Sequence, residues 1–543
     1  MKIGEYLIQR VQATGTRHVF GIQGDYVLNF YAQLCASPLK VINTCDEQGA
    51  GFAADAYARM TGFGVLCVTY GVGGLKLANS TAQAFAELSP VLVISGAPGM
   101  AERKHDPLLH HKVRSFETQL NVFREMTVAQ AVLGDGKTAA AEIHRVINAI
   151  KETKRPGYIE LPRDMVQADI KIDESEITAP EPPEVDQTAV DEALREVMDM
   201  LAAAKRPIVM AGVEIHRFGL QSLFLKFLER SGLPFVTGIL GKSIAAENHP
   251  QYVGVYVGGM SPDDVREAVE GSDCVIAVGP YLTDLATGIF THHIDPGQSV
   301  VMAPDNILVR HHTYPDVGMK YFLESLIAAM PAGEKSVVQP KKHELSPFVP
   351  QAGTKITVDR LVACVNTFLD DNTTVIAEPG DALFGSLDLR VHGMSEFMSP
   401  AYYASLGFAV PASVGVQLAA PNRRPLVLVG DGSFQMSGME LSVSVRYGLN
   451  PIVVVLNNGG YGTFRPMIDG PFNDIQPWQY ADIVRVIGGG KGFTVSTEDE
   501  FLAALEAAKE NVSSPTLIDV RLDKYDCSER LRRLTDRLKK RIK

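Results

Sequence analysis

The sequence predicts an α/β protein of three domains, each with a mostly parallel β-sheet flanked by helices. Short β-rich runs alternate with helical stretches along the whole chain, which is typical of parallel α/β layers. The 543 residues are too many for a single core, and two proline-rich stretches, 166–185 and 331–355, interrupt the alternation as linkers would. We therefore predict domains at 1–175, 190–330 and 356–543.

Each predicted domain contains short apolar runs that are expected to form buried strands. The candidate strands are 18–20, 65–69, 91–95 and 158–161 in the first domain, 207–212, 274–279 and 299–302 in the second, and 374–378, 425–429 and 451–456 in the third. At the two ends of the chain, residues 1–7 are predicted to begin an amphipathic helix, and the basic stretch 528–543 a solvated terminal helix.

The composition is that of a soluble globular protein without a basic footprint. Net charge is −12, with 46% hydrophobic and 21% charged residues, which argues against a nucleic-acid partner. No run approaches the length of a membrane span and no signal peptide is visible, so a membrane partner is not expected. The six cysteines are scattered without metal-binding spacing, and we interpret them as the reduced cysteines of a cytoplasmic protein.

The third domain carries the most informative pattern. Gly-Asp-Gly-Ser at 430–433 ends one predicted strand and Asn-Asn at 457–458 ends the next, and the 24 residues 433–456 between them suffice for one helical crossover. Because open α/β sheets bind ligands at the carboxyl ends of their strands, these groups are predicted to share a site. Carboxylate, amide and carbonyl oxygens suit Mg²⁺, and glycines let the backbone approach a phosphate. The pattern predicts a clamp for Mg²⁺ and a diphosphate.

Taken singly, Gly-Asp-Gly and Asn-Asn are ordinary turns. At the ends of two strands and one crossover apart, they resemble the cofactor motif of the thiamine diphosphate enzymes. The resemblance implies thiamine diphosphate and Mg²⁺ as cofactors, with Asp431, the Asn458 side chain and the Gly460 carbonyl as metal ligands. The cofactor-binding residues that it implies are Thr69, Gly380, Asp381, Leu406, Gly430, Asp431, Gly432, Ser433, Asn458, Gly460 and Tyr461.

A helix predicted to begin near Asp46 carries a glutamate in its first turn. In isolation, Glu47 is best interpreted as a capping or dipole-compensating carboxylate. The small residues that follow it resemble the activating-glutamate segment of the same family, and Glu47 falls on the matching position. The resemblance implies that Glu47 hydrogen-bonds a ring nitrogen of the cofactor and promotes loss of the proton from the cofactor's reactive carbon.

Two further segments of the first domain carry titratable residues. His110-His111 is equally consistent with polar loop residues, and because neighbours on a helix or strand point in different directions, the pair is not expected to share one metal ion. It resembles the paired histidines of 2-keto acid decarboxylases, which implies protonation and charge stabilisation around the reacting groups. The turn 21–25 resembles the GxPGD turn of these enzymes, with Gln23 in place of proline, and implies proton transfer by Asp25.

Several apolar positions are open to two interpretations. Leu406 is ordinary core or, by resemblance, the residue that props the cofactor into a bent shape; Phe384 and Phe464 line an aromatic or long aliphatic substrate pocket or are core. Phe464 is a departure, because pyruvate and indolepyruvate decarboxylases usually carry a glutamate there. In phenylpyruvate decarboxylases, which also lack it, a middle-domain aspartate is a candidate substitute. Asp284 matches that position, and is equally consistent with a helix cap.

The resemblance covers essentially the whole chain and is greatest to phenylpyruvate and indolepyruvate decarboxylases. It implies non-oxidative decarboxylation of a bulky 2-keto acid, with the site between two subunits: Glu47, Asp25 and the histidines from one chain, the clamp from its partner. A dimer is the minimum unit and a tetramer the common form. The alternatives are a carboligase or synthase using the same cofactor, an aliphatic branched-chain 2-keto acid decarboxylase, a flavin-binding oxidase and a non-catalytic binding protein.

Overall fold

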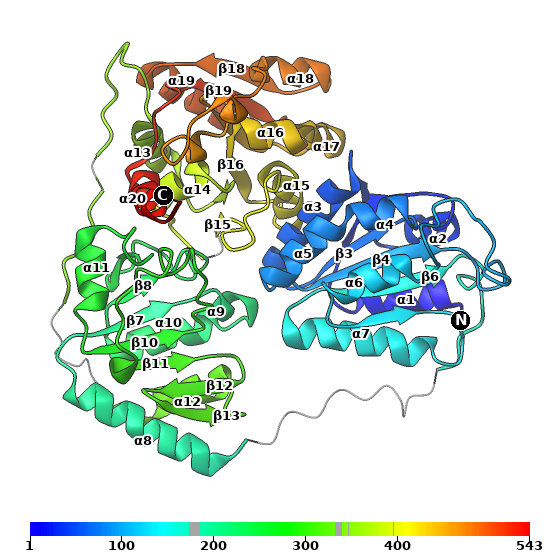
Figure 1. Cartoon of the computed structure of the whole chain (residues 1–543), viewed down its shortest axis with the longest axis horizontal. Helices are drawn as coiled ribbons and strands as arrows, with labels where there is room; N and C mark the ends of the chain where they lie inside the picture. Colours follow the sequence, from blue (N-terminus) through cyan, green and yellow to red (C-terminus); the bar gives the residue numbers. More distant parts are fainter. Residues whose placement is uncertain (173–184, 332–338, 346, 395, 543) are drawn as a thin grey trace.

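The computed structural model describes residues 1–172, 185–331, 339–345, 347–394 and 396–542. These residues form three α/β units, each built on one sheet that is wholly or mostly parallel (Figure 1). The predicted fold class is thereby confirmed. The limits proposed for the three domains stay predictions.

The first unit is a six-stranded parallel sheet with the strand order β2-β1-β3-β4-β6-β5. Its strands are β1 (His18–Ile22), β2 (Lys40–Asn43), β3 (Gly64–Val68), β4 (Val91–Ala97), β5 (Gln130–Val132) and β6 (Gly157–Pro162). Its helices are α1 (Ile3–Gln12), α2 (Leu28–Ala36), α3 (Glu47–Thr61), α4 (Val72–Lys76), α5 (Ala78–Ala86), α6 (Thr118–Arg124) and α7 (Ala139–Thr153).

The middle unit has seven strands in the order β13-β12-β11-β10-β7-β8-β9, and β11, β12 and β13 form an antiparallel edge on an otherwise parallel sheet. The strands are β7 (Pro207–Ala211), β8 (Phe235–Thr237), β9 (Tyr252–Val255), β10 (Cys274–Val278), β11 (Ser299–Met302), β12 (Asn306–Val309) and β13 (His312–Pro315). The helices are α8 (Gln187–Ala203), α9 (Glu214–Arg217), α10 (Gln221–Ser231), α11 (Asp263–Glu270) and α12 (Met319–Ala329).

The third unit is a six-stranded parallel sheet with the order β15-β14-β16-β17-β19-β18. The strands are β14 (Thr373–Ala377), β15 (Phe397–Met398), β16 (Arg424–Gly430), β17 (Ile452–Asn457), β18 (Lys491–Val495) and β19 (Thr516–Arg521). The helices are α13 (Val358–Phe368), α14 (Asp381–Ser386), α15 (Ala409–Ala419), α16 (Asp431–Ser437), α17 (Leu441–Tyr447), α18 (Ile483–Val486), α19 (Glu498–Glu510) and α20 (Glu529–Ile542).

The two strands that end in the predicted clamp are direct neighbours. β16 and β17 pair in parallel, and Gly430 is in register with Leu456. Both strands are fully buried along their centres, as expected for apolar runs covered by helices on both faces. The register therefore brings the acidic turn and the paired asparagines to one edge of the sheet, as their spacing predicted.

The first and third units meet through helix α3 on helix α15. A β-carbon placed on Gly415 would lie 2.1 Å from the Ala53 carbonyl oxygen, so α15 can approach the α3 backbone only where it carries no side chain. The middle unit contacts the first through Tyr281, whose hydroxyl donates to the Ala86 carbonyl over 2.8 Å. Figure 1 shows the first unit beside the third, with the middle unit below the third.

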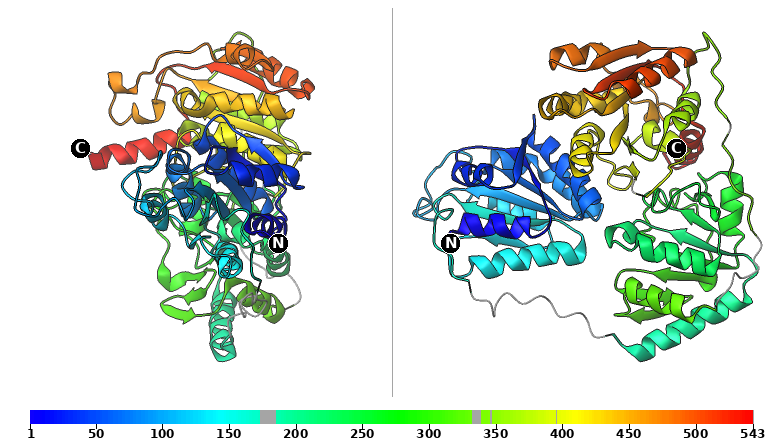
Figure 2. Two further views of the ribbon diagram at one scale, coloured as in Figure 1. Left: turned by 90° about the vertical axis from the view of Figure 1, so that its right-hand side faces the viewer. Right: turned by 180° about the vertical axis from the view of Figure 1, so that it is seen from behind.

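Two sequence predictions about connecting and terminal segments need correction. The predicted linker includes residues 166–170, but Val166 is buried and its carbonyl accepts a hydrogen bond from Gly4 of α1; residues 173–184 lie outside the described part of the chain. The terminal helix is predicted to be solvated, yet Leu531 and Leu534 of α20 are buried in a cluster shared with the middle unit. The far end of α20 projects from the body of the molecule (Figure 2).

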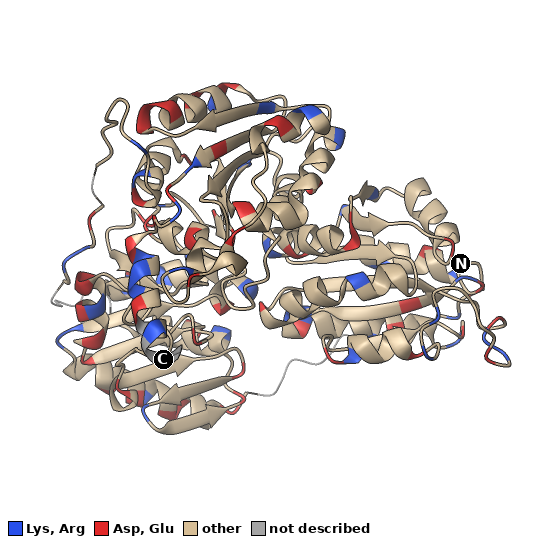
Figure 3. Cartoon of the chain, turned by 45° about the horizontal axis from the view of Figure 1, so that its top comes forward, with Lys and Arg blue, Asp and Glu red and all other residues tan. Residues whose placement is uncertain are grey.

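Charged residues of both signs are interspersed along the backbone of all three units (Figure 3). Arginine and lysine are concentrated on α20, whose Arg530 binds Asp388 over 2.7 Å and whose Arg533 lies 3.4 Å from Asp263. Within the described residues, no helix is both long enough and apolar enough to cross a membrane.

Candidate active site

Asp431 is the centre of the predicted clamp, where β16 ends and α16 begins. Its side chain is buried, and Oδ2 accepts hydrogen bonds from the backbone N–H groups of Gly459 and Gly460 over 2.7 and 3.0 Å. Burial nevertheless raises the pKa of this carboxyl to about 6. A carboxylate held in a site that disfavours its charge is suited to a cation, so the donor set fits Mg²⁺.

The clamp opens into a pocket of about 400 Å³. All of the sequence-predicted cofactor residues of the third unit line it, together with both predicted substrate-pocket residues. These residues are Gly380, Asp381, Phe384, Leu406, Gly430, Asp431, Gly432, Ser433, Asn458, Gly460, Tyr461 and Phe464. The glycines at 430 and 459 have open space where a side chain would lie, which leaves backbone free to approach a phosphate group.

A buried glutamate positions the segment that carries Leu406. Glu378, directly after β14, accepts hydrogen bonds from the backbone N–H groups of Gly407 and Ala409 over 2.6 and 2.7 Å and from that of Phe408 over 3.2 Å. Burial raises its pKa to about 7 in spite of these three donors. Leu406 therefore enters the pocket from a turn that is fixed by a carboxyl group, a contact that the sequence did not predict.

We expect the substitution Glu378→Gln to remove a pH dependence from the stability of the cofactor-free chain. The pKa of this carboxyl is raised from 4.5 to about 7 by folding, so the folded chain binds the proton more tightly. The resulting stability is present at low pH and is lost as pH rises through about 7. As the pH falls from about 8 to about 5, the free energy of unfolding of the wild type should rise by up to about 3 kcal/mol relative to that of the variant. Urea unfolding midpoints across that pH range measure the difference. The same pH dependence in the wild type and the variant would contradict the prediction.

Helix α20 forms part of the pocket wall, a placement that was not predicted from the sequence. Leu534, Thr535 and Leu538 line the pocket. The helix is tied down where it begins, because the Asp381 carboxylate accepts a hydrogen bond from the Ser528 backbone N–H over 2.9 Å. Leucines spaced three, four and seven residues apart were the available signal of a buried face, and the density of arginines obscured it.

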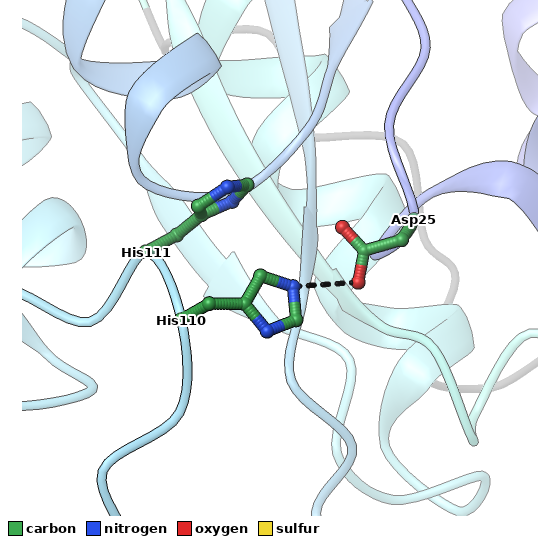
Figure 4. A group of neighbouring side chains, drawn as sticks. All are labelled: Asp25, His110 and His111. Atoms are coloured by element: carbon green, nitrogen blue, oxygen red, sulfur yellow. Dashed lines mark hydrogen bonds and ion pairs between the residues drawn. The ribbon is translucent and has the colours of Figure 1, made fainter.

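A second group of functional candidates lies in the first unit (Figure 4). Asp25 follows β1, and its Oδ2 lies 2.8 Å from His110 Nε2. The His110 ring stacks on Tyr26 at a centroid distance of 4.7 Å. The Arg163 guanidinium lies over the Tyr26 ring, 4.9 Å from its centroid, and 3.5 Å from Asp25. Tyr26 and Arg163 hold the pair in place but were not singled out from the sequence.

His111 lies beside His110 in a turn, where the residue has a φ of 66°. The two rings are 4.8 Å apart, and the ligand atoms of Asp25, His110 and His111 all lie within 4.8 Å of one another. The expectation that adjacent histidines diverge was therefore wrong, because it assumed a helix or strand. A β-carbon placed on Gly71 would lie 2.4 Å from the His111 carbonyl oxygen, so this turn packs directly on backbone.

Glu47 begins helix α3, but it is not the helix cap. Asp46 is the N-cap, and its side chain accepts a hydrogen bond from the Gln48 backbone N–H over 2.7 Å. The Glu47 carboxylate instead lies 3.3 Å from the Lys76 ammonium. Thr69, at the end of β3, is buried, and its hydroxyl has no hydrogen-bond partner among the described residues. An orphaned hydroxyl of this kind fits a position that faces a bound cofactor.

The remaining candidates are Asp284 and the two phenylalanines predicted to line the substrate pocket. Asp284 is exposed in a turn, where its carboxylate accepts from the Leu285 backbone N–H over 2.8 Å; the neighbouring Leu285, not Asp284, lines the pocket. Because the segment is a turn, the alternative interpretation of Asp284 as a helix cap is wrong. Phe384 is 5% exposed and Phe464 is 50% exposed, so Phe464 has the freer ring in the pocket.

The two groups of candidates do not form one pocket within a single chain. In the described part of the chain, the residues that line the clamp pocket belong to the middle and third units, and none comes from the first. Asp25, Glu47, Thr69 and the histidines lie on the first unit. The chain therefore presents two separate groups of candidates, the predicted clamp on the third unit and the carboxylate and imidazole groups on the first.

Three α/β units, with a buried acidic turn and paired asparagines together at one sheet edge of the third, form the architecture of a thiamine diphosphate enzyme. Three family models match the chain: the thiamine pyrophosphate enzyme N-terminal domain at residues 1–121, the central domain at 194–330 and the C-terminal domain at 383–520. The chain belongs to the thiamine diphosphate-dependent 2-keto acid decarboxylase family, and it is accordingly a carboxy-lyase.

Individual relatives match the chain over nearly its whole length. It is 34% identical to an indole-3-pyruvate decarboxylase of Azospirillum brasilense, covering 98% of this chain and 97% of the relative. It is 32% identical to an alpha-keto-acid decarboxylase of Mycobacterium leprae, covering 98% and 95%. A pyruvate decarboxylase isozyme 3 of Saccharomyces cerevisiae is 31% identical, with 97% of each chain covered.

Proposed function

We propose that this enzyme decarboxylates bulky 2-keto acids, with phenylpyruvate or indolepyruvate preferred, using thiamine diphosphate and Mg²⁺. The register of β16 on β17 carries the proposal, since it unites Asp431 and the paired asparagines at one sheet edge. Asp431, the Asn458 side chain and the Gly460 carbonyl would hold the metal, and that carbonyl already accepts from the Gly462 backbone N–H over 2.9 Å. The relative named for indole-3-pyruvate supports an aromatic substrate.

When bound, thiamine diphosphate would supply the carbon nucleophile for the keto carbon and an acceptor for the electron pair that departing carbon dioxide leaves behind. Glu47 would hydrogen-bond the ring nitrogen of the cofactor. The Asp25–His110 pair would hold and deliver the proton that replaces carbon dioxide, and His111 would lie beside the developing charge. The apolar wall of the pocket disfavours the substrate carboxylate and so favours its loss.

We further propose that two copies of the chain complete the site. The clamp pocket lacks first-unit residues, and the half-site with Glu47 and the histidines lies elsewhere on the same chain. A partner whose first unit faces this clamp would bring the two half-sites together, so a dimer is the minimum active unit. We propose a tetramer as the assembled form and the cytoplasm as its location.

The proposed function is tested by comparing kcat/KM for phenylpyruvate, indolepyruvate, a branched-chain keto acid and pyruvate, with both cofactors present. We expect the aromatic acids to be favoured over pyruvate by at least about tenfold, because the Phe464 ring and the α20 leucines offer apolar surface that pyruvate cannot fill. Preference for an aliphatic acid would contradict the proposed aromatic substrate. Failure to decarboxylate any of the four, with a carboligation product formed instead, would overturn the reaction.

A further inference from the structure

Lys76 is the cation that faces the proposed activating glutamate. It is the last residue of α4, and its ammonium bonds the Asp46 carboxylate and lies 3.3 Å from Glu47 Oε2. Among the described residues, it is the one cationic side chain that forms an ion pair with Glu47. The Lys76 side chain is 53% exposed and that of Glu47 is 13% exposed, so the ion pair lies at the rim of the half-site.

The other groups around Glu47 are acidic or neutral. Asp46 shares the Lys76 ammonium, and burial raises the pKa of Glu440, which accepts hydrogen bonds from the backbone N–H groups of Cys45 and Asp46, to about 7. Tyr31 is also close enough for its pKa, raised chiefly by burial, to be raised further by the Glu47 charge. Lys76 is therefore the group that offsets the negative charge of this segment.

The ion pair leaves half of the Glu47 carboxylate open. Lys76 contacts Oε2, and in the described structure no hydrogen-bond donor is paired with Oε1. A β-carbon built on Gly73 of α4 would lie 3.3 Å from Oε1, which is a tight contact, so the glycine at this position leaves room beside the oxygen. One oxygen is thus held and the other is available to a ligand.

We propose that Lys76 is a positioning residue, whose ammonium orients the Glu47 carboxylate so that one oxygen is presented to the ring nitrogen of the cofactor. The proposal rests on the activating role proposed above for Glu47. A carboxylate does not need a neighbouring cation in order to hydrogen-bond a ring nitrogen. The observation that supports a role for Lys76 is therefore its contact with both Asp46 and Glu47.

The Lys76–Glu47 ion pair is expected to affect the orientation and charge of the carboxylate more than the stability of the fold. Exposed ion pairs add little stability, because water screens them. In the proposed dimer a second chain covers this face, and attraction between charges grows as water is excluded.

The test compares Lys76→Met, Lys76→Arg and a surface control, Lys151→Met, in the full chain loaded with thiamine diphosphate and Mg²⁺. The rate of deuterium exchange at the reactive carbon of the bound cofactor, measured by NMR, reports activation. We expect Lys76→Met to lower this rate about tenfold, since a misplaced catalytic group costs rate before it costs binding. Calorimetry should give a cofactor Kd within about twofold of wild type, and Lys76→Arg should recover most of the rate.

The outcomes separate this inference from the proposed function. If Lys76→Met exchanges at the wild-type rate while Glu47→Gln does not, the positioning role is wrong and the role of Glu47 stands. If Lys76→Met loses rate, cofactor affinity and melting temperature together, and Lys76→Arg does not restore the rate, the lysine is merely structural and the inference is again wrong. If Glu47→Gln itself exchanges normally, the proposed function of Glu47 fails first.

Discussion

Replacing Glu47 by glutamine is expected to reduce decarboxylation by about 10² to 10⁴, the usual contribution of a positioned acid–base group. Glutamine keeps the size of the side chain and can still form a hydrogen bond, but it cannot hold the proton in the same way. Cofactor affinity should change little, because the clamp around Asp431 lies in a different unit of the fold. The effect should therefore appear in kcat and not in the Kd for thiamine diphosphate.

Steady-state kinetics and calorimetry on Glu47→Gln check this expectation, with Glu152→Gln near the exposed end of α7 as the control. Glu47 is not the cap of α3, so the substitution should leave the helix intact. A melting temperature equal to that of the wild type would confirm that the fold is unaffected. Near-normal turnover in the variant would show that another group activates the cofactor.

The fold was predictable where local patterns carry the information. Apolar runs such as 425–429 and 451–456 form buried strands in any α/β protein, and their spacing allows only a short crossover. In the structure the two strands are parallel neighbours, with Gly430 in register with Leu456. The residues predicted for the clamp lie together in the structure.

The parts that were missed depend on contacts between residues far apart in the chain. Glu378 acts on backbone about thirty residues away, and α20 crosses from its own unit to the pocket wall, so neither role is written in a local pattern. Lys76 reaches Glu47 from a separate helix for the same reason. His110 and His111 converge because they occupy a turn, whose side-chain directions no periodicity predicts.

Replacing Asp431 by asparagine is expected to have the opposite kinetic signature to Glu47→Gln. Asparagine retains an oxygen that can accept from Gly459 and Gly460 but loses the charge that would bind Mg²⁺. Cofactor affinity should fall by about 100-fold or more, since even indirect metal contacts are worth about 10- to 100-fold. Calorimetric titration with thiamine diphosphate and Mg²⁺ measures the loss, and Asp482→Asn, at an exposed site of the same unit, is the control.

The stability of the Asp431→Asn variant shows whether the carboxylate serves binding or folding. Burial raises the pKa of Asp431, which means that the folded chain without metal disfavours its charge. The cofactor-free variant should therefore melt at or above the wild-type temperature. Adding thiamine diphosphate and Mg²⁺ should then raise the melting temperature of the wild type but not that of the variant, because ligand binding stabilises only the form that binds. If the variant melted below the wild type without cofactor, and its melting temperature still rose on addition of thiamine diphosphate and Mg²⁺, the metal would have to bind elsewhere.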